Sequence, residues 1–308
     1  MSNPISLVMP VLMLAAVLAP AQPAQSTHSS LRTEMVVSTE WLAGHLHDPD
    51  LVVVCVTATP EFYTKGHIPG ARNIALSDIA VTVNGVPNEL PSTDQLQRIF
   101  EAAGITNQSR VVLYSERYGL LAARAYFTLD YLGLANRAAL LDGGIEKWKT
   151  EQRELSSDTP KIAPSHLKIS LNPSILVETA AMRDLAQSKS SKVAIVDARP
   201  ADEFTGIKLS EDVSRAGHIP ASTSFYWMNN LVSRENPVLR PEAELRRMYA
   251  QLAVGADARF VTYCRTGMQS SFDYFVAKYL GYEVSMYDAS FYEWSRQDLP
   301  VETSATSK

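Results

Sequence analysis

Short apolar runs alternate with helix-like patterns in both halves of the chain. In the second half the patterns predict strands at residues 193–196, 260–263 and 284–287, and helices at 242–252, 268–280 and 291–296. In the first half they predict strands at 51–56, 110–114 and 139–141, and helices at 94–103 and 120–132. Such alternation predicts an α/β fold in which each half is a parallel sheet flanked by helices.

The two halves are copies of one unit. The segment Gly-His-Ile-Pro occurs at 66–69 and 217–220, VVLYS at 111–115 matches FVTYC at 260–264, and LDGG at 141–144 matches YDAS at 287–290. The matches keep their order and a nearly constant spacing of about 150 residues, which indicates a duplicated domain rather than a solenoid. We place an N-terminal domain at 31–155, a proline-containing linker at 156–173 and a C-terminal domain at 174–308.

Composition narrows the class of protein. With 46% hydrophobic and 20% charged residues, the 308-residue chain has the balance of a globular protein. Its formal net charge of −5 argues against a nucleic-acid or anionic-membrane surface, although a small anionic substrate needs only local positive potential. We expect a monomer.

The first thirty residues differ from the rest. Residues 5–19 are almost wholly apolar, Ala19-Pro20-Ala21 offers a small-residue cleavage site, and a polar stretch follows. We therefore predict a signal peptide at 1–30 and export to the periplasm, with no membrane attachment after cleavage. No Lys or Arg precedes the apolar run, so an uncleaved N-terminal membrane anchor remains the alternative.

The two cysteines have different settings. Cys55 lies in the apolar run LVVVCV and is expected to be a buried structural thiol. Cys264 ends a predicted strand and opens the loop CRTGMQSS, after which a helix begins. Backbone N–H groups and the helix dipole at such a loop stabilise negative charge, so we expect Cys264 to be largely thiolate near neutral pH. Gly267 permits the tight turn and Arg265 adds a cation.

The repeat supports a nucleophilic rather than a structural Cys264. The first copy has Ser115 and Glu116 where the second has Cys264 and Arg265. The first copy thus lacks both the thiol and the adjacent cation, and we predict that it is catalytically silent.

Further residues are candidates for supporting roles. Arg199, at the carboxyl end of a strand, is either a second anion-binding residue or the partner of Asp197 in an ion pair. Asp197 is expected to orient Arg265 or the loop. His218 invites a general-base role, but its counterpart His67 in the silent copy favours a structural one. The sequence has no metal-ligand spacing and no nucleotide or phosphate loop, so no metal and no cofactor are predicted.

Together, the two GHIP segments, the strand ending in Asp197-Ala198-Arg199, the Cys264 loop and the segment YDASFYEW at 287–294 resemble the tandem rhodanese family over about residues 36–301. The resemblance implies a sulfurtransferase that carries sulfur as a persulfide on Cys264. The expected partners are a small anionic sulfur donor and an acceptor that is a thiol or, in an assay, cyanide. The donor-binding set implied by the loop is Arg265, Thr266, Gly267, Met268 and Gln269, with Arg199, and Ser270 supports it.

The residue after the cysteine separates branches of this family. Thiosulfate sulfurtransferases usually have Arg there, as Arg265 is here, and mercaptopyruvate sulfurtransferases usually have Gly. Phosphatases built on this fold carry an Arg six positions after the cysteine, where this chain has Ser270. We therefore predict a thiosulfate sulfurtransferase. The alternatives are a 3-mercaptopyruvate sulfurtransferase, or a persulfide carrier or redox sensor without turnover.

Three departures from the family pattern bear on the sulfur donor. Thr266 stands where mitochondrial-type thiosulfate enzymes have Lys, and Glu203 stands where animal members have a substrate-binding Arg. Ala289 replaces a usual Gly. They leave the fold prediction intact, but the donor, the acceptor and the pathway stay open.

Overall fold

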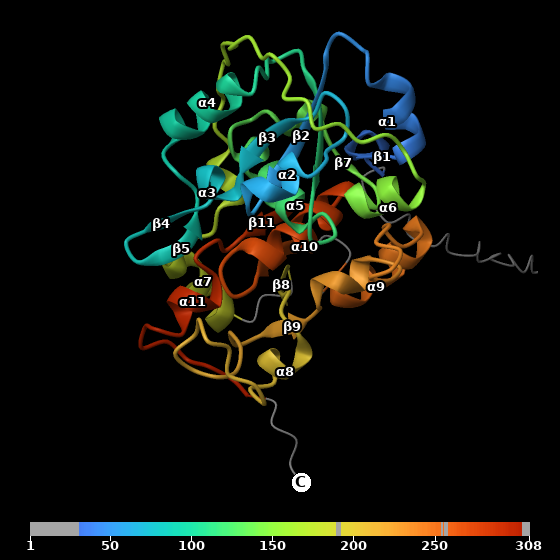
Figure 1. The fold of residues 1–308 in the computed structure, drawn as a ribbon. Helices are drawn as coiled ribbons and strands as arrows, with labels where there is room; N and C mark the ends of the chain where they lie inside the picture. Colours follow the sequence, from blue (N-terminus) through green and yellow to red (C-terminus); the bar gives the residue numbers. More distant parts are fainter. Residues whose placement is uncertain (1–30, 189–191, 254, 256–257, 304–308) are drawn as a thin grey trace, which may run out of the picture.

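The computed structural model describes residues 31–188, 192–253, 255 and 258–303; the predicted signal peptide lies outside them. Each half contains one parallel sheet with helices on both faces, which confirms the predicted fold class (Figure 1). The strand order is β1-β7-β6-β2-β3 in the first half and β11-β10-β8-β9 in the second. No helix in the described part of the chain has the length and apolarity needed to cross a bilayer.

The first half runs to residue 150. Its strands are β1 (Val36–Val37), β2 (Leu51–Thr57), β3 (Arg72–Ala75), β4 (Val81–Val83), β5 (Val86–Glu89), β6 (Arg110–Ser115) and β7 (Ala138–Leu141). Its helices are α1 (Thr39–His45), α2 (Pro60–Thr64), α3 (Leu76–Ile79), α4 (Thr93–Ala102), α5 (Leu120–Tyr131) and α6 (Gly144–Thr150), with 3-10 turns η1 (Thr33–Met35) and η2 (Ala135–Arg137).

The second half repeats this order from residue 173. Its strands are β8 (Val193–Asp197), β9 (Ser222–Ser224), β10 (Arg259–Tyr263) and β11 (Val284–Met286). Its helices are α7 (Thr179–Ser188), α8 (Ala201–Phe204), α9 (Glu242–Leu252), α10 (Met268–Tyr279) and α11 (Ser290–Trp294), with 3-10 turns η3 (Pro173–Ile175) and η4 (Trp227–Asn230).

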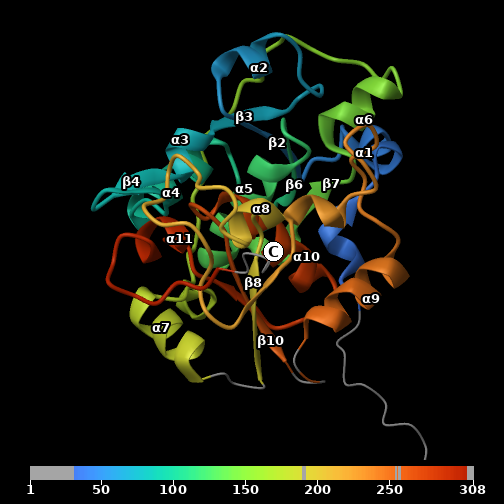
Figure 2. The same ribbon diagram turned by 90° about the horizontal axis from the view of Figure 1, so that it is seen from below.

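The two halves meet along α5 and α10, which lie side by side between the sheets (Figures 1 and 2). Tyr126 of α5 packs edge-on against Phe275 of α10 at 4.8 Å between ring centroids. Phe127 and Tyr274 form the reciprocal pair at 5.1 Å. One continuous cluster of buried apolar side chains includes residues of both halves. The repeats are therefore joined by a shared core rather than tethered loosely.

The linker follows the surface of the first half before the second begins. Residues 157–172 form no helix or strand. Their backbone is held by hydrogen bonds from Ser165 N to Glu101 O at 3.0 Å and from Asn172 N to Tyr131 O at 2.8 Å. The segment thus packs against α4 and the end of α5.

Sequence periodicity did not predict the short edge strands or the β4–β5 hairpin. The hairpin turns at Asn84-Gly85, where both residues have positive φ, 51° and 82°. An Asn-Gly pair between strand-like segments is the usual sign of a two-residue hairpin, so this sequence contained the signal. The hairpin matters below, because Asn88 near its end reaches the second half.

Candidate active site

The thiol of Cys264 lies where the central region of the second sheet meets a helix. Cys264 directly follows β10, which pairs with β8 on one side and β11 on the other, and α10 begins at Met268. Gly267 caps α10 with φ 76°, a left-handed conformation that favours glycine. Ligands of open parallel sheets gather at this carboxyl edge.

The loop leaves several donors unused. Within the described residues, no hydrogen-bond acceptor is found for the backbone N–H groups of Arg265, Thr266, Met268 and Gln269. Free N–H groups at a helix N-terminus are suited to bind an anion.

Ser290 holds the Cys264 loop through hydrogen bonds to its backbone. Its hydroxyl accepts hydrogen bonds from the backbone N–H groups of Cys264 and Gly267, each at 3.1 Å, and donates to Tyr287 O at 2.9 Å. Ser290 is fully buried and has φ 57°. The first copy has Gly144, with φ 55°, at this position, and Gly144 has no side chain to hold a loop. Sequence analysis missed Ser290, although the comparison of Gly144 with Ser290 contained the signal.

The sulfur itself is enclosed. Ser270 Oγ donates to Cys264 Sγ at 3.5 Å and also lies 3.2 Å from Met286 Sδ. Cys264 is only 1% exposed.

Arg265 is the nearest cation in sequence, and it is held by carboxylates. Its Nε lies 3.3 Å from Glu203 Oε2 and its Nη1 lies 3.8 Å from Asp212 Oδ2. Glu203 is buried, whereas the Arg265 side chain is 33% exposed. Because the guanidinium is partly solvated, it can exchange these partners for an incoming anion.

Arg199 and Asp197 form a separate buried ion pair. Arg199 Nη2 donates to Asp197 Oδ2 at 2.6 Å and to Gly217 O at 2.8 Å. Burial lowers the pKa of Arg199, but the Asp197 carboxylate outweighs it and the net pKa is raised. Among the described residues, Asp197 pairs with Arg199, and no ion pair joins Asp197 to Arg265; that Asp197 orients the loop stays a prediction. Arg199, 1% exposed, is in the ion pair that was its alternative role.

The chain is similar to known proteins over most of its length. The rhodanese-like domain family matches residues 38–151 and 180–297. The chain belongs to the rhodanese family. The sulfur carrier protein TtuD of Thermus thermophilus is 32% identical over 85% of this chain and 93% of its own length. A thiosulfate sulfurtransferase of Azotobacter vinelandii is 31% identical over 87% of this chain and 97% of its own length.

Solved structures show the same fold at lower identity. The anaerobic ergothioneine biosynthesis enzyme from Chlorobium limicola, in complex with trimethyl histidine, superimposes with a TM-score of 0.77. It is 23% identical and covers 89% of this chain and 71% of that one. The structure of YnjE gives 0.77 at 24% identity, covering 89% and 69%. These likenesses concern the fold.

The GHIP histidines make matching contacts in both rhodanese copies. His218 Nδ1 lies 2.7 Å from Phe204 O, and the two rings stack at 3.7 Å. His67 has the same arrangement with Tyr63, at 3.0 Å and 3.7 Å. Both copies keep these contacts, including the first, which has no cysteine at the loop, and this agrees with a structural role.

The first rhodanese copy has a hydroxyl in place of the thiol. Ser115 Oγ donates to Glu116 O at 2.8 Å and accepts from Ala122 N at 3.1 Å, so it is fully used by its own loop. Cys55 in β2 is wholly buried, as predicted, and burial raises the pKa of its thiol to about 12. Cys264 is thus the one cysteine in the described chain that lies on a loop opening a helix.

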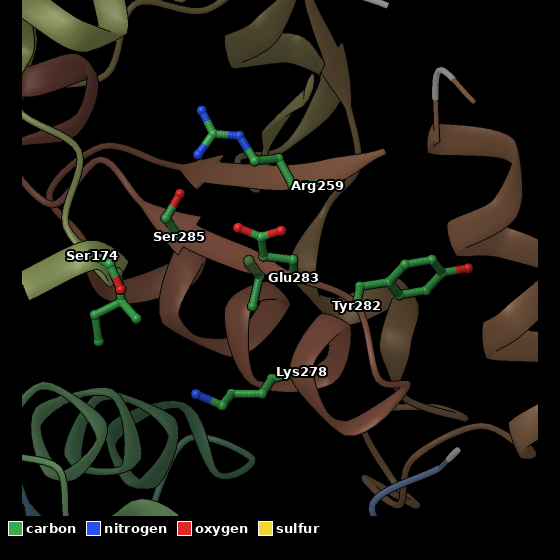
Figure 3. Close-up of a pocket in the computed structure, with 8 residues that line it drawn as sticks. Ser174, Arg259, Lys278, Tyr282, Glu283 and Ser285 are labelled. Carbon is green, nitrogen blue, oxygen red and sulfur yellow. The ribbon is translucent and has the colours of Figure 1, made fainter. Parts of the chain in front are cut away.

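A cavity lies elsewhere in the molecule. It has a volume of about 340 Å³ and is lined by Arg259, Lys278, Glu283 and Ser285 among others (Figure 3). Arg259 begins β10 whereas Cys264 follows its end, so this cavity is at the opposite edge of the sheet. Within the described residues, no cluster of His, Cys, Asp or Glu has the arrangement of a metal site.

Proposed function

We propose that this rhodanese is a thiosulfate sulfurtransferase in which Cys264 carries the transferred sulfur. The Cys264 thiolate attacks the outer sulfur of thiosulfate, a new S–S bond forms, and the old S–S bond breaks with its electron pair leaving on sulfite. Cyanide or a cellular thiolate then attacks the outer sulfur of the persulfide. Thiocyanate or a new persulfide leaves, and the Cys264 thiolate is regenerated.

The observation that carries the proposal is the loop around Cys264. Free N–H groups at the start of α10 can stabilise the anionic sulfur and the developing negative charge during transfer. Arg265, one-third exposed, can turn toward the oxygens of the donor. The Arg after the cysteine and the similarity to the Azotobacter thiosulfate sulfurtransferase both support thiosulfate as donor.

The decisive experiment uses the two cysteines as a matched pair. After incubation with thiosulfate, the intact protein should gain the mass of one sulfur atom, and Cys55→Ser should gain it too. Cys264→Ser should gain none and should have no thiosulfate:cyanide transferase activity. Transfer that survives in Cys264→Ser would overturn the proposal.

The donor is tested by comparison. We expect a higher kcat/KM for thiosulfate than for 3-mercaptopyruvate, measured side by side with cyanide as acceptor. Equal or higher kcat/KM for 3-mercaptopyruvate would assign the protein to the mercaptopyruvate sulfurtransferases. The proposal that Cys264 carries the sulfur as a persulfide would still stand.

A second candidate function is that of a sulfur carrier. Two observations favour it: the burial of Cys264, and the similarity to a protein named as a sulfur carrier. A carrier would form the persulfide stoichiometrically but give only slow turnover with cyanide.

A further inference from the structure

The silent half contributes side chains to the Cys264 loop. Arg124 of α5 is completely buried and donates to both carboxylate oxygens of Asp288, at 2.5 and 2.9 Å. It also donates to Asn88 O at 2.5 Å. The side-chain amide of Asn88 in turn donates to Thr266 Oγ1 at 2.9 Å. The first half therefore contacts the loop at Thr266, and it contacts the segment behind the loop at Asp288.

Asp288 and Arg124 lie directly against the turn of the loop. A Cβ atom placed on Gly267 would be 2.1 Å from Asp288 Oδ1 and 3.1 Å from Arg124 Nη1. Asp288 is also two residues from Ser290, whose hydroxyl holds Cys264 N and Gly267 N. The position of the Asp288 carboxylate thus affects the loop both by contact and through Ser290.

The other copy provides an internal comparison. Gly119 caps α5 as Gly267 caps α10. Arg124 comes five residues after Gly119, and Phe272 comes five residues after Gly267, so Phe272 is the counterpart of Arg124. A Cβ atom on Gly119 would meet the Phe272 ring at 3.6 Å. The silent loop therefore faces a phenyl group, whereas the thiol-bearing loop faces a guanidinium.

The aspartates differ in the same way. Asp142 in the silent copy accepts from the backbone N–H of Leu239 at 2.8 Å, whereas its counterpart Asp288 pairs with Arg124. In the described part of the chain, a buried arginine thus pairs with the aspartate behind the thiol-bearing loop and not with its counterpart in the other copy.

We propose that Arg124 and Asn88 are positioning residues for sulfur transfer, so that the silent half is part of the working site. The inference rests on the proposed role of Cys264. Arg124 keeps the Asp288 carboxylate in place through two parallel hydrogen bonds. Loss of that cation leaves a buried carboxylate unpaired, and the segment that bears Ser290 must shift to reach water. Asn88 fixes the loop at Thr266.

The test compares two ion pairs between the halves. Arg124→Met should lower kcat of thiosulfate:cyanide transfer by about 100-fold, the effect of misplacing a reacting group by an ångström. Its KM for thiosulfate should change little, because Arg124 is completely buried. Lys278→Met breaks another largely buried pair between the halves, with Asp130, and should keep the wild-type kcat. Arg124→Lys, which keeps the charge, should recover part of the loss.

A second variant avoids a failure to fold. Asn88 has φ 61°, which glycine adopts freely, so Asn88→Gly removes the amide without straining the backbone. It should lower kcat severalfold with little loss of stability. Wild-type kcat in both Arg124→Met and Asn88→Gly, each folded at the assay temperature, would overturn the inference.

A readout independent of turnover separates this inference from the proposed function. The rate at which iodoacetamide alkylates Cys264 reports the loop even if thiosulfate is not the donor. It should differ from wild type in Arg124→Met and match wild type in Lys278→Met. Unchanged alkylation in Arg124→Met would count against positioning, whereas an inactive wild-type protein would count only against the proposed function.

Discussion

Replacing Ser290 with alanine removes the hydroxyl on which the Cys264 loop rests. Two backbone donors, Cys264 N and Gly267 N, lose their acceptor, and Tyr287 O loses a donor. At about 1 kcal/mol for each buried hydrogen bond, the free energy of unfolding should fall by about 3 kcal/mol. That is a large share of the roughly 5–15 kcal/mol that stabilises a typical domain.

The matched control is Ser285→Ala in β11. Ser285 is also buried, but its hydroxyl has no hydrogen-bond partner among the described residues, so its removal should change the free energy of unfolding little. Ser290→Gly separates the hydrogen bonds from the backbone: it loses the same bonds but relieves the left-handed φ of 57°, and should be about 1 kcal/mol more stable than Ser290→Ala.

Urea unfolding followed by tryptophan fluorescence measures these differences, since the chain has four tryptophans. The transferase kcat should fall in Ser290→Ala and Ser290→Gly alike, because both release the loop. If Ser290→Ala and Ser285→Ala unfolded at the same urea concentration, the assignment of Ser290 as the support of the loop would be wrong.

Three further predictions concern other residues. Gly267→Ala should lose both stability and kcat, because its Cβ would clash with Asp288. Gly70 has almost the same φ but open space around it, so Gly70→Ala should lose only the stability that the strained left-handed backbone costs. Equal losses of stability in the two variants would refute the clash. Burial, and then the Asp288 carboxylate, raise the pKa of Glu89 from 4.5 to about 8, so its contribution to stability is complete below pH 4.5 and is lost as the pH rises through 8. Glu89→Gln should therefore gain stability relative to wild type between pH 5 and pH 9, and parallel pH curves in urea unfolding would contradict this. At pH 8 native protein should take up no alkylating label on Cys55, since its pKa is about 12, and peptide mapping that finds label there before unfolding would contradict its burial.

Much of the fold could be predicted because it depends on local pattern. The helix at 242–252 and the strand beginning at 193 follow from side-chain periodicity and a preceding proline, and the structure has them at those bounds or within a residue. Strands at the sheet edges, such as Ser222–Ser224, were missed because three residues carry too little periodicity to detect.

The candidate site divides in the same way. The sequence could indicate Cys264, Arg265 and Gly267 because they are neighbours in one loop, and the repeat showed that only one copy has the thiol. It could not assign the partner of Asp197, since Arg199 and Arg265 were both plausible and only the packed structure puts one of them within 2.6 Å.

By itself, then, the sequence determined a duplicated α/β protein with one reactive-type cysteine at the start of a helix. Those properties are encoded by residues close together in the chain, or by the comparison of one copy with the other. Only the tertiary structure decided that Arg124 and Asn88 of the first half reach the loop of the second. Such contacts join residues far apart in sequence, and they depend on how α5 packs against α10, which no local pattern specifies.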